Sequence, residues 1–125
     1  MMGKNCRSTG FQGEELACQY IVKKGYRIIE RNWRSEHYEI DIIAQDSDSI
    51  VFCEVKTSRT NSFGPSVTWV TPEKVKRISK AAAEYIATHD TGGCSFRFDV
   101  IGLDIKGTKN EINHIKNAFI VPEDG

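Results

Sequence analysis

Several common sequence features are scarce or missing in this chain. It has four cysteines, at positions 6, 18, 53 and 94, and their spacing matches neither a zinc site nor a C-x-x-C redox motif. No uncharged apolar stretch approaches the ~20 residues that cross a bilayer. The first ten residues carry charges without the apolar run of a signal peptide. We therefore expect a soluble, cytoplasmic protein that has no disulfides and does not contact a membrane.

The chain also lacks an excess of charge of either sign. Seventeen lysines and arginines balance seventeen aspartates and glutamates, so any basic surface must arise from segregation of charge. The sequence contains no phosphate loop, dinucleotide fingerprint, G-x-S-x-G elbow or H-E-x-x-H motif. These absences remove the main sequence support for several large enzyme classes.

The hydrophobic pattern predicts a single α/β domain over residues 1–125, with flexible ends at 1–8 and 122–125. The predicted elements are a helix ending at Gly25, strands at 26–34, 38–45 and 50–57, a helix from Thr71 to about His89, and strands at 94–105 and 112–121. Because one helix separates the third and fourth strands, we expect a mixed sheet flanked by helices.

Charged residues interrupt two strands that are otherwise apolar. Side chains alternate faces along a strand, so Glu39 and Asp41 share one face, and Glu54 and Lys56 share one face of the next strand. If the turn at 46–49 sets the register, Asp41 lies opposite Glu54, Glu39 lies opposite Lys56, and all four charges share a face. Opposed carboxylates with Cβ atoms ~4.5–5.5 Å apart are destabilising unless they share a proton or a cation. Mg²⁺ prefers such oxygen ligands.

The first helix offers a third acidic residue. Glu14 shares a helical stripe with Ala17, Cys18 and Ile21, where it is the exception among small and apolar residues. If this stripe faces the sheet, Glu14 joins the hairpin acids. Two or three acids, a divalent cation and a lysine suit the binding of a phosphodiester and the activation of a water. The even-numbered residues from Tyr38 to Ala44 are expected on the opposite face of the hairpin.

A plainer interpretation of the acidic residues stays open. Acid patterns of this kind arise by chance, and the hairpin face is then simply solvated. Glu39 and Lys56 would form a surface ion pair that contributes ~0–1 kcal/mol. Ile43, Ile50 and Phe52 argue against this interpretation, because they are expected on the same face and indicate that it is covered.

Basic residues on both sides of the hairpin form a second pattern. They are Lys23, Lys24, Arg27, Arg31, Arg34, Lys74, Lys76, Arg77 and Lys80. Contacts from such residues to a nucleic-acid backbone weaken steeply as salt rises. The alternative is that they are ordinary solvated charges. Trp33 and Trp69 suit stacking on unpaired bases, but packing in the core or in a loop explains them better.

Four stretches, taken in order, resemble the YraN-like family of uncharacterised bacterial proteins. They are "GEELACQYIVKKGYRIIERNWR", "EIDIIAQDSDSIVFCEVKT", the "FG" of the following loop and "RFDVIGLD". The resemblance covers residues from about 13 to 119. That family is similar to restriction-endonuclease-like PD-(D/E)XK nucleases, and in particular to archaeal Holliday-junction resolvases. The resemblance implies an αβββαβ core and a metal-dependent endonuclease acting on DNA, including branched or structured DNA.

The resemblance also implies roles for individual residues. Asp41, Glu54 and the Val55 carbonyl would hold Mg²⁺ or Mn²⁺, Glu14 would complete the site, and Lys56 would orient the attacking water. The residues implied or expected in nucleic-acid contact are Glu39, Arg34, Arg59, Lys74 and Arg77.

The sequence departs from the family pattern at two places. Tyr38 replaces the glycine of the usual "G-E-I-D", and Arg59 is displaced by one position from the commoner "KTR".

Two functions of other classes remain as alternatives to the nuclease. One is a non-catalytic nucleic-acid-binding or assembly module that keeps the fold without turnover. The other is a protein-interaction domain whose acidic cluster pairs with a basic partner. The complete acid and lysine set favours the nuclease, whereas the balanced net charge favours the alternatives. A homodimer is expected by analogy with resolvases, because two symmetric cuts need two sites.

Overall fold

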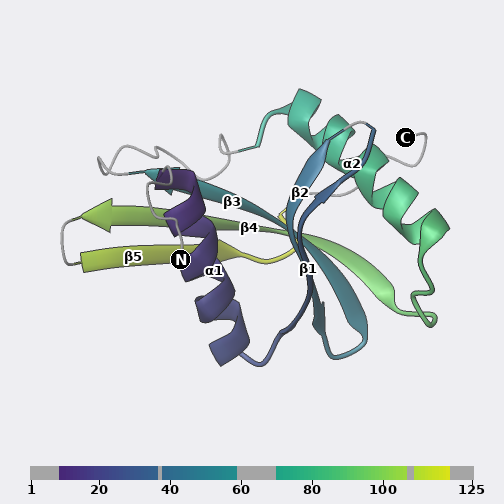
Figure 1. Ribbon diagram of the computed structural model, residues 1–125, viewed down its shortest axis with the longest axis horizontal. Helices are drawn as coiled ribbons and strands as arrows, with labels where there is room; N and C mark the ends of the chain where they lie inside the picture. The colour runs from purple at the N-terminus through teal and green to yellow at the C-terminus, as the bar shows by residue number, and fades with distance from the viewer. Residues whose placement is uncertain (1–8, 37, 59–69, 107–108, 119–125) are drawn as a thin grey trace, which may run out of the picture.

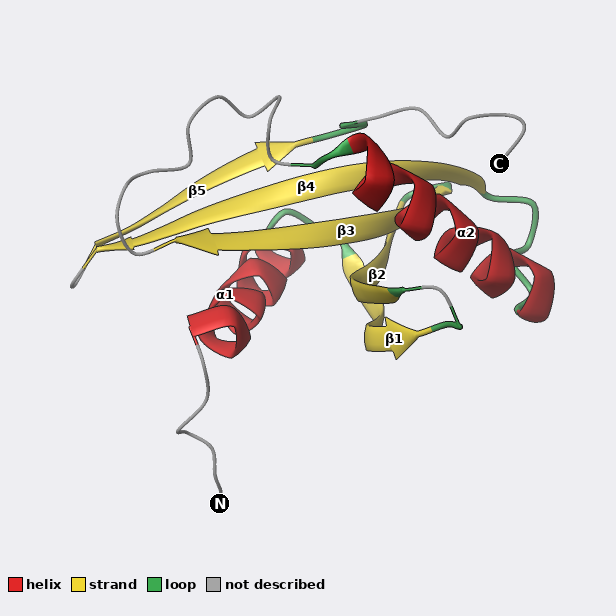
Figure 2. Ribbon diagram, turned by 90° about the horizontal axis from the view of Figure 1, so that it is seen from above, coloured by secondary structure: helices red, strands yellow, loops and turns green. Residues whose placement is uncertain are grey.

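Two helices cover opposite faces of a five-stranded sheet (Figures 1 and 2). The computed structural model describes residues 9–36, 38–58, 70–106 and 109–118. The elements are α1 (Thr9–Lys23), β1 (Arg27–Arg34), β2 (Glu39–Asp46), β3 (Ser49–Ser58), α2 (Pro72–Thr88), β4 (Ser95–Lys106) and β5 (Lys109–Ile115). In this described part of the chain, neither helix has the length and apolar character needed to span a bilayer.

The sheet is mixed, as the order of the elements predicts. Its strands lie in the order β1-β2-β3-β4-β5, and β3 and β4 are parallel while all other neighbours are antiparallel. A parallel connection requires a crossover, which α2 provides. The prediction of a mixed α/β sheet flanked by helices is therefore confirmed, and the αβββαβ order is consistent with a restriction-endonuclease-like fold.

Each helix buries a distinct apolar cluster against the sheet. On α1, the expected stripe of Ala17, Cys18 and Ile21 is buried and contacts residues of β2, β3 and β4. On α2, Ile78, Ala82 and Tyr85 pack against the other face. Thr71 caps α2 as predicted, because its hydroxyl oxygen accepts a hydrogen bond from the Lys74 amide at 3.2 Å. The two clusters contribute most of the burial that holds the helices in place.

The fifth strand differs from the prediction. It was expected at 112–121, but β5 ends at Ile115 and a turn follows, while residues 119–121 lie outside the described part of the chain. The strand ends because the chain turns at Asn117, which has a left-handed φ of 54°, and the Ala118 amide beyond the turn donates a hydrogen bond to the Phe98 carbonyl of β4 at 2.7 Å. Apolar propensity alone does not predict this turn.

The expected alternation of side chains in β2 is wrong at one point. Tyr38 and Ile40 pack on the α2 side, whereas Ile42 and Ala44 pack on the α1 side. The change of face falls at Asp41. Opposite it in β1, between the pairs Arg31/Ile42 and Trp33/Ile40, Asn32 has a left-handed φ of 55°. Asparagine tolerates this conformation better than most residues. The side chains of β1 and β2 can therefore change face here without a glycine.

The N-terminal part of α1 crosses the end of β3 closely. Gly13 is buried, and a Cβ atom there would overlap Thr57 Oγ1 and lie 3.1 Å from both Thr57 Cβ and Cγ2. A larger residue would push this part of the helix, and with it Glu14, away from β3.

Gly13→Ala should lower the free energy of unfolding by about 1–2 kcal/mol, because overpacking exceeds the ~1 kcal/mol that alanine gains in helix propensity. Urea denaturation measures the effect. The matched background is Thr57→Ala, which removes Oγ1 and Cγ2 and leaves only Cβ at 3.1 Å, so Gly13→Ala should cost clearly less there. An equal loss in both backgrounds would contradict the close contact.

Candidate functional site

The candidate site begins where β2 separates from β3. The register of this hairpin is the predicted one, with Gln45 opposite Ile50, and its ladder ends at the pair Ile42/Cys53. At the next position the Asp41 carboxylate replaces a backbone carbonyl of β2 as the acceptor: its Oδ2 accepts a hydrogen bond from the Val55 amide at 2.8 Å. A side chain thus satisfies a backbone donor that β2 no longer reaches.

Two of the cross-strand pairs expected from the sequence do not form. Asp41 does not face Glu54 within the β2–β3 ladder, and Glu39 does not face Lys56. Instead, Glu39 pairs with Arg34 of β1, and the two side chains form an ion pair of 3.0 Å. The prediction of a surface ion pair between Glu39 and Lys56 is therefore wrong. The physical reason is that β2 separates from β3 at Asp41, so the first residues of β2 pair with β1 only.

Glu54 is buried and has two donors from the α2 side. Its Oε2 accepts hydrogen bonds from the Tyr38 hydroxyl and from the Lys74 ammonium, both at 3.2 Å. Tyr38 is the residue that departs from the glycine of the family pattern, and here it contacts the acid of the next strand. Lys74 was expected in nucleic-acid contact, and its ion pair with Glu54 places it at the acidic centre instead of at a distance from it.

Burial and mutual repulsion make ionisation of the acids costly. Burial raises the pKa of Asp41 to about 8, and the charge on Glu54 adds to this effect, while the Val55 amide opposes it. Burial also raises the pKa of Glu54, although Lys74 and Tyr38 act in the opposite direction. The charge of Glu14 raises the pKa of both acids. The three acids predicted as a set therefore act on one another across two strands and a helix.

Glu14 is held near the two other acids by the contact of Gly13 with Thr57. Its Oε1 accepts a hydrogen bond of 2.8 Å from the Asn32 side-chain amide. Asn32 is the left-handed residue opposite Asp41, so the irregularity in β1 orients both acids. The sequence prediction missed Asn32, and the signal available was an asparagine in the middle of an otherwise regular strand pattern.

Lys56 follows Glu54 by two residues in β3 and is partly exposed. It forms no ion pair with any residue in the described ranges, so no neighbouring carboxylate there neutralises its ammonium. Arg59 lies outside the described residues. The catalytic role expected for Lys56 stays a prediction.

The oxygen atoms of Asp41, Glu54 and Val55 suit a hard divalent cation, although they do not form a complete coordination shell. Among the described residues, no three histidine, cysteine, aspartate or glutamate side chains are grouped closely enough to hold a metal ion. Asp41 and Glu54 nevertheless supply two carboxylates whose ionisation is opposed by burial and by each other, and Val55 adds a carbonyl oxygen. Mg²⁺ is commonly held by one or two carboxylates and keeps several waters, so two acids are sufficient.

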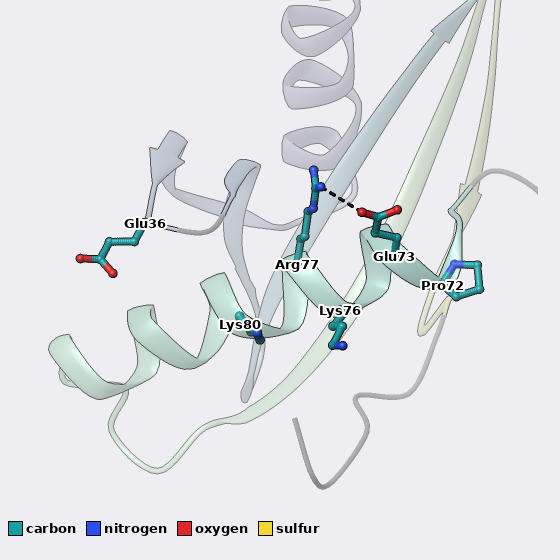
Figure 3. Close-up of a pocket in the computed structure, with 6 residues that line it drawn as sticks. All are labelled: Glu36, Pro72, Glu73, Lys76, Arg77 and Lys80. Atoms are coloured by element: carbon teal, nitrogen blue, oxygen red, sulfur yellow. Dashed lines mark hydrogen bonds and ion pairs between the residues drawn. The ribbon is translucent and has the colours of Figure 1, made fainter.

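Beyond Lys74, the other cations of α2 line a separate cavity. Lys76, Arg77 and Lys80 line a cavity of about 740 Å³ together with Glu36, Pro72 and Glu73 (Figure 3). Arg77 forms an ion pair of 3.0 Å with Glu73, one turn earlier on the same helix. Trp33, by contrast, packs edge-on against Tyr85 in the core, and Trp69 lies outside the described residues.

The mixed sheet and the two flanking helices define an α/β protein whose fold is consistent with a restriction-endonuclease-like arrangement. The chain belongs to the uncharacterised protein family UPF0102, whose family description matches residues 13–103. It is 43% identical over 113 residues to a UPF0102 protein of Syntrophomonas wolfei, an alignment that covers 90% of this chain and 98% of that protein.

Other relatives are similar over nearly the whole chain. A UPF0102 protein of Trichlorobacter lovleyi is 43% identical over 121 residues, covering 95% of both chains. One of Geobacter metallireducens is 42% identical over 118 residues, covering 94% of this chain and 97% of the relative. The family expected from the sequence is therefore confirmed, and the matched region contains Glu14, Asp41, Glu54 and Lys56.

The raised pKa of Asp41 predicts a specific dependence of stability on pH. Between the ordinary aspartate value near 4 and about 8, the folded state binds a proton that the unfolded state has lost. The stabilisation is complete below pH 4 and is lost as the pH rises toward 8, with a slope of at most about 1.4 kcal/mol per pH unit. Urea denaturation in metal-free buffer should show this slope reduced in Asp41→Asn, which keeps an acceptor for Val55.

The control for this measurement is Asp48→Asn in the exposed turn between β2 and β3, which should retain the wild-type slope. Parallel profiles for the wild type and Asp41→Asn would show that Asp41 ionises normally in the fold.

Proposed function

We propose that this protein is a metal-dependent endonuclease that hydrolyses phosphodiester bonds in DNA, including branched or structured DNA. The observation that supports this most directly is the meeting of Asp41 and Glu54 at a sheltered point where β2 separates from β3. Such a pair of acids is stable in its ionised form when a cation lies against it. Perturbed acids in a covered site favour a functional role over a structural one.

Each residue of the centre has a distinct part in the proposal. Asp41, Glu54 and the Val55 carbonyl would hold Mg²⁺ or Mn²⁺, and Glu14 would complete the site directly or through a water. The bound cation would supply Lewis-acid stabilisation of the charge that develops on the phosphate. Lys56 orients the attacking water and stabilises the negative charge of the transition state.

Lys74 links the acids to the proposed DNA-binding surface. With no cation bound, its ammonium compensates part of the charge of Glu54 at 3.2 Å. With Glu54 compensated by a bound cation, Lys74 would be available to a backbone phosphate. Lys76, Arg77 and Lys80 continue the same helix and would contact the phosphates further along the strand. Two symmetric cuts in a branched substrate would require two copies of the site, and hence a homodimer.

Cleavage of branched or flapped DNA tests the proposal. The wild type should cleave in the presence of Mg²⁺ and stop when the metal is chelated. Asp41→Asn and Lys56→Ala should each reduce the rate by roughly 100-fold or more, because each loses stabilisation of transition-state charge. Lys109→Ala, at the exposed start of β5, is the control and should cleave normally. Equal residual activity in all four proteins would indicate a contaminant and overturn the proposal.

The second candidate is a nucleic-acid-binding module without turnover. It is favoured by the ion pair between Lys74 and Glu54, because a permanently compensated acid needs no metal. Millimolar Mg²⁺ separates the two candidates. A catalytic site should be stabilised against heat by the metal in the wild type but not in Asp41→Asn, whereas a non-catalytic module should show no difference.

The basic face of α2 predicts how DNA binding responds to salt. Replacing Lys76 and Lys80 together with glutamine should flatten the plot of log affinity against log salt, by about one unit for each phosphate that the variant no longer neutralises. Fluorescence anisotropy in the presence of Ca²⁺, or in the Asp41→Asn background to prevent cleavage, measures this slope. The control is Lys109→Gln, and an unchanged slope in the double variant would exclude α2 as the binding surface.

A further inference from the structure

A second polar cavity lies at the opposite end of α1 from Glu14. Its volume is about 390 Å³, within the usual range of small-molecule pockets. The residues that line it are Tyr20, Lys24, Tyr26, Asp46, His114 and Lys116. None of these residues belongs to the acidic centre, and none has a part in the proposed nuclease chemistry.

His114 is held in one orientation by a buried carboxylate. Its Nε2 lies 2.7 Å from Oδ2 of Asp99, a residue that is completely buried. Asp99 also accepts hydrogen bonds from Nε and Nη2 of Arg97, at 2.9 and 3.1 Å, and from the Asn117 amide at 3.0 Å. Burial alone would raise the pKa of Asp99, but the bonds from His114, Arg97 and Asn117 outweigh it and keep the pKa low.

An ionised Asp99 is an acceptor alone, so the His114 Nε2 carries a hydrogen and donates it. The His114 Nδ1 is therefore the ring nitrogen that remains for a ligand, and it has no hydrogen-bond partner among the described residues. The imidazole lies edge-to-face against Tyr20 and Tyr26, with ring centroids 5.6 and 5.9 Å apart, and its side chain is 5% exposed. A carboxylate behind the ring and aromatic walls around it form a rigid, oriented group.

The charges around the cavity favour an anion. Arg97 forms ion pairs with Asp46 at 3.1 Å and with Asp99 at 2.9 Å, so both carboxylates are already compensated. Lys24 and Lys116 form no ion pair with a described residue, and the Lys24 ammonium lies 5.6 Å above the Tyr20 ring. Three cations, Arg97, Lys24 and Lys116, thus face the two carboxylates Asp46 and Asp99, and one positive charge remains uncompensated.

We propose that this cavity binds a phosphate monoester dianion, either free phosphate or the terminal phosphate of a nucleotide. Lys24 and Lys116 supply donors and two positive charges, and His114 lies at the same cavity as a further polar contact. The Tyr26 oxygen accepts from Nη2 of Arg97 at 2.6 Å, so the Tyr26 hydroxyl hydrogen is available to a ligand oxygen. A dianion with three terminal oxygens uses the two lysines and the Tyr26 hydroxyl better than a singly charged carboxylate or phosphodiester does.

Binding is tested with inorganic phosphate, thymidine 5′-monophosphate and thymidine, without added metal. Long-range nitrogen–proton NMR spectra of the histidine rings report on His114, and calorimetry gives the affinity. Phosphate and the nucleotide should shift the His114 nitrogens saturably, whereas thymidine should not. If thymidine 5′-monophosphate binds more tightly than inorganic phosphate, the site is assigned to the terminal phosphate of a nucleotide. If the two bind equally, the site is assigned to free phosphate. No saturable shift with either phosphate, or equal binding of thymidine, would overturn the proposal.

Reversing the charge of exposed lysines at the cavity tests whether phosphate binds there, and it leaves the buried hydrogen bonds of Asp99 intact. Lys24→Glu and Lys116→Glu change exposed side chains and should each weaken binding about tenfold or more. Lys109→Glu, at the exposed start of β5, is the control and should change the affinity by less than about twofold. An equal loss in the control would mean non-specific attraction and overturn the site. Asp41→Asn should bind phosphate normally, so failure of the nuclease proposal and failure of this one are distinguishable.

Discussion

The hydrogen bond from the Val55 amide to the Asp41 carboxylate is the interaction on which the candidate site depends. It forms where β2 separates from β3, and it satisfies the Val55 amide, which has no partner in the β2–β3 ladder. The same bond brings an acid to the place where Glu54 is already buried. An isolated pair of buried acids is costly, and here the Lys74 ammonium at 3.2 Å compensates part of the charge of Glu54.

The irregularity of β1 at Asn32 is the counterpart of this separation. A regular strand would have kept every second side chain of β1 and β2 on one face of the sheet. The left-handed Asn32 changes the face in both strands at once, and its side chain then holds Glu14 at 2.8 Å. Local strain in the edge pair thus positions two of the three acids, while the interior strands β3 and β4 stay regular.

Helix α1 connects the two sites that we propose. Near its N-terminus, Gly13 permits close packing on Thr57 and places Glu14 beside the acids. Its last turns carry Tyr20 and, just beyond the helix, Lys24, which line the cavity proposed to bind phosphate. The buried stripe of α1 holds both ends in fixed relation to the sheet. The free thiols of Cys18 and Cys53 belong to this packing, where they act as small apolar residues.

Periodicity in the sequence was sufficient to determine the order of helices and strands, the mixed sheet, the register of the β2–β3 hairpin and the buried stripe of α1, because these follow from local patterns. It also singled out Glu14, Asp41, Glu54 and Lys56 as charges in apolar surroundings. The tertiary structure alone decided that Glu39 pairs with Arg34, that Lys74 and Tyr38 contact Glu54, and that His114 meets Asp99. These contacts join residues from different elements, and they depend on a twist at Asn32 and Asp41 that no two-residue repeat encodes.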